Sequence, residues 1–190
     1  MSRVTTPTIR FTVDEYYRMA EAGVLGRRRT ELINGRIRKM APQLDPHVFV
    51  ISKTSRTLNR IVSDDEMLVV LGTLNLDRYT SVDPDFMWFN VPLGTPEYDR
   101  PLPLLLIEVS NTTYRKDSGI KLRKYAKAGI SDYWIINIPH GRIEVYQDPS
   151  NPTGRAPDWR YETVRHFVRG ERITLKNRPE VTLGVDDLLV

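Results

Sequence analysis

The first forty residues show two patterns of apolar and polar positions that predict a helix and then a hairpin. Thr12 and Glu15 have the spacing of a capping box, which predicts a short helix ending near residue 22. An Asn-Gly pair at positions 34–35 lies between two short apolar runs within residues 30–40. Such a pair favours a type I′ turn, so this segment is predicted to form a β-hairpin.

Apolar spacing further along the chain predicts a second helix and then several strands. Asp45 can cap a helix that runs to about Val62, in which apolar residues recur at roughly helical intervals. Three strand-like runs follow it, over residues 67–71, 73–76 and 86–91.

The densest apolar segment, Leu102–Val109, predicts a strand that is buried on both faces. A charged helix over residues 115–128, closed by Gly129, and a second buried strand over residues 133–138 follow it. A strand, a helix and a strand in this order form a crossover unit, so the two strands should pair in parallel. The rest of the chain is β-rich, and the predicted fold class is therefore α/β, a mixed β-sheet flanked by helices.

Length and composition indicate an ordered globular protein. The 190 residues predict a single domain over residues 1–190, with residues 1–10 as a flexible N-terminal tail. The longest apolar run is too short to span a bilayer, and the N-terminus lacks the apolar stretch of a signal peptide. We therefore expect a cytoplasmic location and no membrane partner. The absence of cysteine excludes disulfides and zinc–thiolate sites.

The charge balance is mildly basic, with a net charge of +4 and a pI near 9.4. Such a bias alone raises the expectation of a nucleic-acid partner only modestly. Its distribution is more informative, because six basic residues lie between Arg115 and Lys127 and only Asp117 opposes them.

Two carboxylates stand out against this apolar background. Glu108 lies near the end of the strongest apolar run, and Asp85 lies where an earlier strand should begin. A buried carboxylate is costly without a partner, so Glu108 needs a metal ion, a lysine, or solvent at the strand end. Two carboxylates from adjacent strands can hold a hard cation such as Mg²⁺, which prefers oxygen ligands and keeps several waters.

Several segments stand in a fixed order along the chain: Phe11-Thr12-Val13-Asp14-Glu15-Tyr16, Thr30-Glu31-Leu32-Ile33-Asn34-Gly35-Arg36-Ile37, His47, Pro84-Asp85, Ile107-Glu108-Val109-Ser110, Asp117, Lys121, Tyr125 and Ala128-Gly129-Ile130-Ser131-Asp132-Tyr133-Trp134. In this order they resemble the PD-(D/E)XK nuclease superfamily and, within it, the Uma-two family of restriction-endonuclease-like proteins. The resemblance implies a restriction-endonuclease-like core and hydrolysis of DNA phosphodiester bonds with Mg²⁺ or Mn²⁺. It also implies that Asp85 and Glu108 hold the metal.

One position departs from the superfamily pattern. The signature asks for lysine two residues after the second acid, where this chain has Ser110. The Uma-two pattern places a lysine on the following helix instead, and that residue is Lys121. Asp117, Lys121 and Tyr125 are spaced four apart and should share one helix face. The other interpretation of the same spacing is an exposed Asp117–Lys121 surface pair.

The remaining candidates have accessory roles. Glu31 is a possible third acid beside the metal or an exposed strand residue, and His47 is a possible phosphate or water contact or a plain surface residue. Asp83 would share a strand face with Asp85. Four basic residues are predicted to hold the DNA backbone: Arg56, Arg60, Lys124 and Lys127.

Two other classes of function stay open at this point. The first is a catalytically inactive nucleic-acid-binding module that keeps the nuclease fold, and the second is an oligomerisation module whose acids are structural. Among enzymes, RNA or a small phosphodiester is an alternative substrate to DNA. A homodimer is plausible for an enzyme that cuts duplex DNA.

Overall fold

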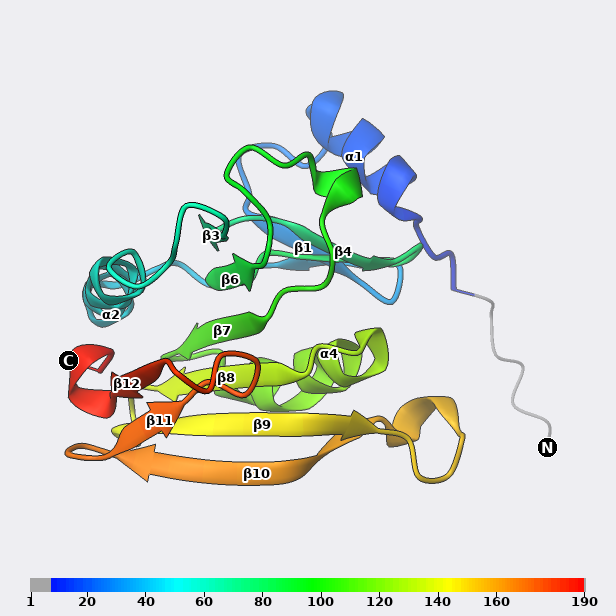
Figure 1. Ribbon diagram of the computed structural model, residues 1–190. Helices are drawn as coiled ribbons and strands as arrows, with labels where there is room; N and C mark the ends of the chain where they lie inside the picture. The colour runs from blue at the N-terminus through cyan, green and yellow to red at the C-terminus, as the bar shows by residue number, and fades with distance from the viewer. Residues whose placement is uncertain (1–7, 190) are drawn as a thin grey trace. The chain divides into compact units, whose positions relative to one another are not determined.

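The structure is a computed structural model that describes residues 8–189 (Figure 1). Contacts between Cα atoms divide the chain into two compact units, residues 1–40 with 73–83 and residues 41–72 with 84–190. We call them the small unit and the large unit. The prediction of a single domain stays a prediction, and residues 1–7 of the predicted tail lie outside the described residues. Within residues 8–189, no helix has the length and apolar character that a membrane span requires.

Within its described residues, 8–40 and 73–83, the small unit contains one α-helix and a four-stranded sheet. Helix α1 (Val13–Glu21) begins at the predicted capping box, where Thr12 N–H donates to Glu15 Oε2 at 2.8 Å and Glu15 N–H donates to Thr12 Oγ1 at 3.2 Å. The sheet has the order β2-β1-β5-β4, with strands β1 (Thr30–Ile33), β2 (Arg36–Lys39), β4 (Leu74–Asp77) and β5 (Thr80–Val82).

The predicted hairpin is confirmed. Strands β1 and β2 pair antiparallel, and Asn34 and Gly35 both have positive φ angles, 55° and 74°, as a type I′ turn requires. Strand β5 was not predicted. It has only three residues, and its place follows from pairing with β1 and β4, which are distant in the sequence.

The large unit is built on a six-stranded sheet with the order β10-β9-β8-β7-β6-β3 (Figure 1). Its strands are β3 (Met67–Val70), β6 (Phe86–Phe89), β7 (Leu105–Ser110), β8 (Asp132–Asn137), β9 (Arg142–Ser150) and β10 (Arg160–Val168). Only β7 and β8 pair in parallel, which confirms the predicted crossover unit. Every residue of β7 is buried, as predicted for this strand. It begins three residues later than expected, after Pro101 and Pro103, which lack the N–H that a central strand must donate.

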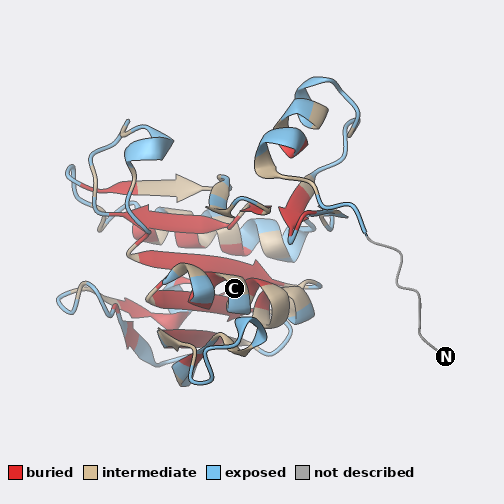
Figure 2. Cartoon of the chain, turned by 90° about the vertical axis from the view of Figure 1, so that its right-hand side faces the viewer, coloured by how far each residue is buried: buried red, intermediate tan, exposed pale blue. Residues whose placement is uncertain are grey.

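The two faces of this sheet differ in character. Alternate residues of β6, β7, β8 and β9 form an apolar core with Val50 and Leu58 of helix α2 (Asp45–Leu58) and with the C-terminal segment. That segment includes β11 (Arg172–Thr174) and β12 (Thr182–Gly184), which pair as a separate two-stranded sheet. The intervening residues face the other side, and several of them are polar or aromatic, including Glu108, Ser110, Tyr133 and Glu144. Figure 2 shows that buried residues concentrate on the strands.

Helix α2 corrects one detail of the sequence prediction. Asp45 is the first helical residue and not the cap, because Leu44 has the extended backbone of an N-cap, with φ −96° and ψ 163°. Pro46 follows at a position where its missing N–H is not needed. The helix ends at Leu58, earlier than predicted, where Asn59 Nδ2 donates to the Ser55 carbonyl at 2.7 Å.

The predicted helix over residues 115–128 has three parts. A short α-helical segment, α3 (Tyr114–Lys116), continues into a π-helical turn, η2 (Asp117–Lys121), and then into α4 (Leu122–Ala128). Gly129 closes it with a φ of 87°, which confirms the predicted C-terminal glycine. The π turn, in which hydrogen bonds join residues five apart, was not predicted. Such turns are frequent at functional sites.

Candidate active site

Asp85 directly precedes β6, and Glu108 lies on the neighbouring strand β7. The N–H of Val109, the residue after Glu108, donates to Asp85 Oδ2 at 2.7 Å, so Asp85 lies beside this part of β7. Both carboxylates are buried, with exposed fractions of 7% and 4%. The role of the two acids as metal ligands stays a prediction.

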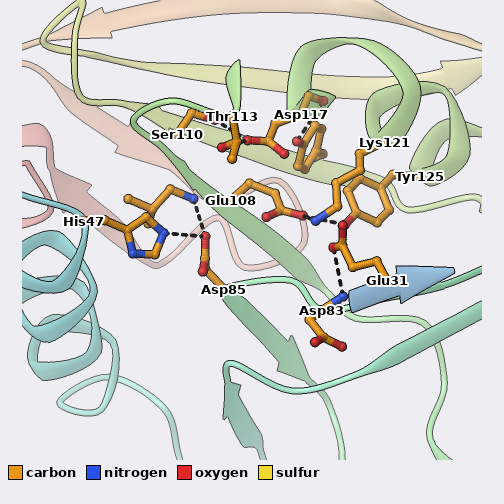
Figure 3. A network of polar contacts seen from close by, with 12 residues as sticks. Glu31, His47, Asp83, Asp85, Glu108, Ser110, Thr113, Asp117, Lys121 and Tyr125 are labelled. Atoms are coloured by element: carbon orange, nitrogen blue, oxygen red, sulfur yellow. Dashed lines mark hydrogen bonds and ion pairs between the residues drawn. The ribbon is translucent and has the colours of Figure 1, made fainter. Parts of the chain in front are cut away.

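Glu108 finds its partner on the helix that follows β7. Lys121 Nζ lies 2.7 Å from Glu108 Oε1, and the Tyr125 hydroxyl donates to the same oxygen at 2.6 Å (Figure 3). Lys121 is 1% exposed, so the ammonium ion is desolvated together with the carboxylate. Three partners were considered for Glu108: a metal ion, a lysine and solvent. The contact observed within the described residues is with a lysine. The expected helix face thus brings Lys121 and Tyr125 to the acid.

Asp117 is held by two hydroxyl groups. It accepts hydrogen bonds from Ser110 Oγ at 2.6 Å and from Thr113 Oγ1 at 2.5 Å, both on Oδ2 (Figure 3). The interpretation of Asp117 and Lys121 as an exposed surface pair is wrong, because both side chains are 1% exposed.

Asp117 and Lys121, at the two ends of the π turn, contact different residues of β7. Asp117 contacts Ser110 and Lys121 contacts Glu108, and these two are neighbours on the same face of β7. The residue that replaces the signature lysine, Ser110, therefore anchors the helix that carries Lys121.

Asp85 is held from two sides. The Val109 N–H donates to Asp85 Oδ2 at 2.7 Å, and His47 Nε2 lies 3.4 Å from the same oxygen. His47 is the third residue of α2 and is only 13% exposed at its side chain, so it is not a plain surface residue. Its Nδ1 atom is buried and has no hydrogen-bond partner within residues 8–189.

The donor set has the chemistry of a site for a hard cation. Mg²⁺ or Mn²⁺ requires only one or two protein carboxylates, and Asp85 and Glu108 would supply two. Asp85 Oδ1 accepts no hydrogen bond from the described residues, and a cation could use it. In the part of the chain that the structure describes, no three His, Asp or Glu side chains gather closely enough to hold a metal by themselves. Water or substrate oxygens would therefore have to complete the coordination.

A family model named Uma2 and described as "Putative restriction endonuclease" matches residues 13–186. The chain belongs to the Uma2 family. A crystal structure from Anabaena variabilis, titled a putative nuclease, has a TM-score of 0.69 to this chain at 17% sequence identity. The match covers 94% of this chain and 97% of that one, and it confirms the predicted fold. No curated protein is a detectable relative in sequence.

Two further acids predicted near the site lie in the small unit of this Uma2-family chain. Glu31 is 1% exposed, so the interpretation as an exposed strand residue is wrong, and its Oε1 accepts from the Asp83 N–H at 3.3 Å. Its role as a third acid stays a prediction. Asp83 accepts from Thr73 Oγ1 at 2.9 Å. Residues 83–85 lie between strands of two sheets, so strand alternation cannot relate Asp83 to Asp85.

The basic residues expected to hold DNA lie in the large unit. Arg56, Arg60 and Lys127 are exposed, and Lys124 is half-buried. Their contact with DNA stays a prediction.

A further polar cluster, which was not predicted from the sequence, is centred on Glu144 of β9. This carboxylate is 0% exposed and accepts hydrogen bonds from Tyr114, Asn137, Arg142 and Tyr146, at distances between 2.6 and 3.0 Å. Ile135 of β8 separates it from Glu108 across the sheet, and both carboxylates lie on the same face. Tyr114 belongs to α3, so Glu144 ties the start of the Lys121 helix to the sheet.

The first prediction concerns the buried pair of Lys121 and Glu108. Lys121→Met should lower the free energy of unfolding by about 3–5 kcal/mol, because it leaves a buried carboxylate without its cation. Adding Glu108→Gln should restore part of that loss, so the double variant should be more stable than the sum of the two single changes. Urea denaturation measures all three variants. Lys127→Met, at an exposed position, is the control and should stay within about 0.5 kcal/mol of wild type.

The second prediction concerns Glu144 and pH. Burial opposes the charged form, but donors from Tyr146, Arg142, Asn137 and Tyr114 outweigh it and lower the pKa of Glu144. A lowered folded-state pKa stabilises the protein above the unfolded value of about 4.3, and this contribution is lost as the pH falls through the folded value. Wild type should therefore exceed Glu144→Gln in stability at pH 7, and the difference should shrink in acid. A difference that does not change between pH 7 and 3 contradicts this, and exposed Glu21→Gln is the control.

Proposed function

We propose that this Uma2-family chain is a metal-dependent nuclease that hydrolyses phosphodiester bonds of DNA. The observation that carries the proposal is the Lys121–Glu108 contact at 2.7 Å, one residue before the Val109 N–H that donates to Asp85. It supplies a lysine to this pair of acids, although the signature position after Glu108 holds Ser110. The family description and the nuclease-like fold support the same class of activity.

Asp85 and Glu108 would hold Mg²⁺ or Mn²⁺. When bound, the ion would polarise a phosphate oxygen and lower the pKa of a coordinated water. The ammonium group of Lys121 would stabilise the negative charge that develops on the phosphate, and its pairing with Glu108 fixes it in place before substrate binds. The Tyr125 hydroxyl orients Glu108, and His47 with the Val109 N–H orients Asp85.

The basic side chains of Arg56, Arg60, Lys124 and Lys127 would neutralise backbone phosphates and hold the substrate. Contacts to phosphates do not depend on the DNA base sequence, so these residues would not select a target site. A homodimer would place two such sites on the two strands of a duplex.

The third prediction concerns the metal. Mn²⁺ at millimolar concentration should raise the melting temperature, because a ligand that binds only the folded state stabilises it by about 2.7 kcal/mol at one hundred times its Kd. Asp85→Asn combined with Glu108→Gln should remove the rise. Asp64→Asn with Asp65→Asn, two exposed acids, is the matched control and should keep it. A melting curve of wild type that Mn²⁺ does not move contradicts a metal site.

The fourth prediction concerns catalysis. At saturating duplex DNA, Lys121→Met should lower the Mn²⁺-dependent cleavage rate by about 10²–10³-fold, as expected for a group that stabilises transition-state charge. Its DNA affinity should stay within a few-fold of wild type. Lys127→Ala should show the reverse, with weaker binding but a retained rate at saturation.

Circular dichroism checks that Lys121→Met remains folded at the assay temperature. Wild-type cleavage by this variant removes Lys121 from the site. Salt-sensitive DNA binding without any cleavage by wild type would identify a binding module that keeps the nuclease fold.

A further inference from the structure

The net charge of the chain resides in the small unit. Its 51 residues carry ten Lys and Arg against six Asp and Glu, a net charge of +4, whereas the large unit carries 18 of each sign. The whole-chain value of +4 therefore does not describe an even basic surface. The small unit holds none of the four residues already proposed to contact DNA.

Part of this charge lies on an edge strand. Strand β2 is at the edge of the four-stranded sheet, and Arg36 and Arg38 on it are exposed. Residues two apart on a strand point to the same face, about 6.8 Å from each other at 3.4 Å per residue. The two guanidinium groups are thus presented side by side.

A third arginine is fixed next to them. Arg10 Nε donates to the Asn34 carbonyl at 3.0 Å, and its guanidinium lies 4.3 Å from the centre of the Tyr79 ring. Gly35 permits this approach, because a Cβ atom there would lie 2.7 Å from Arg10 Cβ. Arg10 is therefore held in position before any ligand binds, and among residues 8–189 its hydrogen bond is made by Nε.

These three arginines line one pocket of about 330 Å³, together with Thr8, Ile33 and Asn34. Within residues 8–189, none of the three arginines forms an ion pair with a carboxylate. Guanidinium groups bind phosphate oxygens in a bidentate manner, so three of them around one pocket suit a phosphate-bearing ligand.

We propose that Arg10, Arg36 and Arg38 form a DNA-backbone contact surface on the small unit, which rests on the proposed function for the identity of its polyanion. Charged residues on an edge strand also prevent pairing with other strands. Edge protection requires charge alone, however, and it explains neither the pocket nor the fixing of Arg10 by the Asn34 carbonyl and the Tyr79 ring.

The fifth prediction tests this surface with Arg36→Gln/Arg38→Gln and a control of equal charge change, Arg160→Gln/Arg169→Gln. The control arginines are also exposed, but they pair with Glu162 and Asp186. Fluorescence anisotropy of a labelled duplex, in EDTA to prevent cleavage, gives the affinity at several salt concentrations. The plot of log affinity against log salt concentration has a negative slope. In the test variant its magnitude should be smaller by about 1.8, at 0.9 for each lost phosphate contact. Between 50 and 200 mM salt, wild type should thus lose about twelvefold more affinity than the variant.

An unchanged slope, or an equal fall in the control, overturns the proposal. The proposal is also overturned if the test variant changes self-association, measured by sedimentation, but leaves the slope unchanged. In that case β2 would be a contact between copies of the chain. Cleavage assays separate this proposal from the nuclease. If wild type cleaves DNA but the slope is unchanged, only the surface fails. If the slope falls as expected but wild type never cleaves, the surface stands and the nuclease proposal fails.

Discussion

Glu108 imposes the main constraint on the large unit, because its carboxylate lies in a strand whose every residue is buried. A charge removed from water in this way must be compensated by a cation and by hydrogen bonds. Lys121 and Tyr125 provide both, at 2.7 and 2.6 Å. The strand can therefore keep an acid at its centre only while the following helix stays docked against it. Structural stability and the candidate chemistry depend on the same contact.

The rest of this sheet face secures the docking of that helix. Ser110 and Thr113 hold Asp117 at the beginning of the π turn, and Glu144 holds Tyr114 one turn earlier. The tyrosine rings of Tyr125 and Tyr133 pack with their centres 4.9 Å apart and bury the side of the helix that faces the sheet. A lysine carried on a helix has a less certain position than one on the strand of the acid. These anchors compensate for that difference and fix Lys121 in front of Glu108.

The two units divide the electrostatics of the chain in a way that composition conceals. The large unit holds Asp85 and Glu108 and has no net charge, while the small unit holds the entire excess of positive charge. The arginines proposed as an additional DNA contact, Arg10, Arg36 and Arg38, therefore belong to the unit that carries the excess positive charge.

Features that depend on neighbouring residues could be predicted from the sequence. The capping box of Thr12 and Glu15, the type I′ turn at Asn34-Gly35 and the terminal Gly129 are local, because each depends on a few consecutive residues. The burial of residues 105–110 and the parallel crossover also followed from the apolar pattern. The four-residue spacing of Lys121 and Tyr125 was enough to place both against Glu108.

Only the tertiary structure decided the partners of the other polar groups. Asp117 accepts from Ser110, a contact that depends on how the helix packs against β7. The Glu144 cluster and the pocket around Arg10 bring together residues that are distant in sequence. The burial of Glu31 likewise depends on distant residues. The position of Asp45 inside α2 depends on the backbone of Leu44, which no side-chain pattern specifies. A sequence encodes which groups require partners, but strand register and helix packing determine which partners they receive.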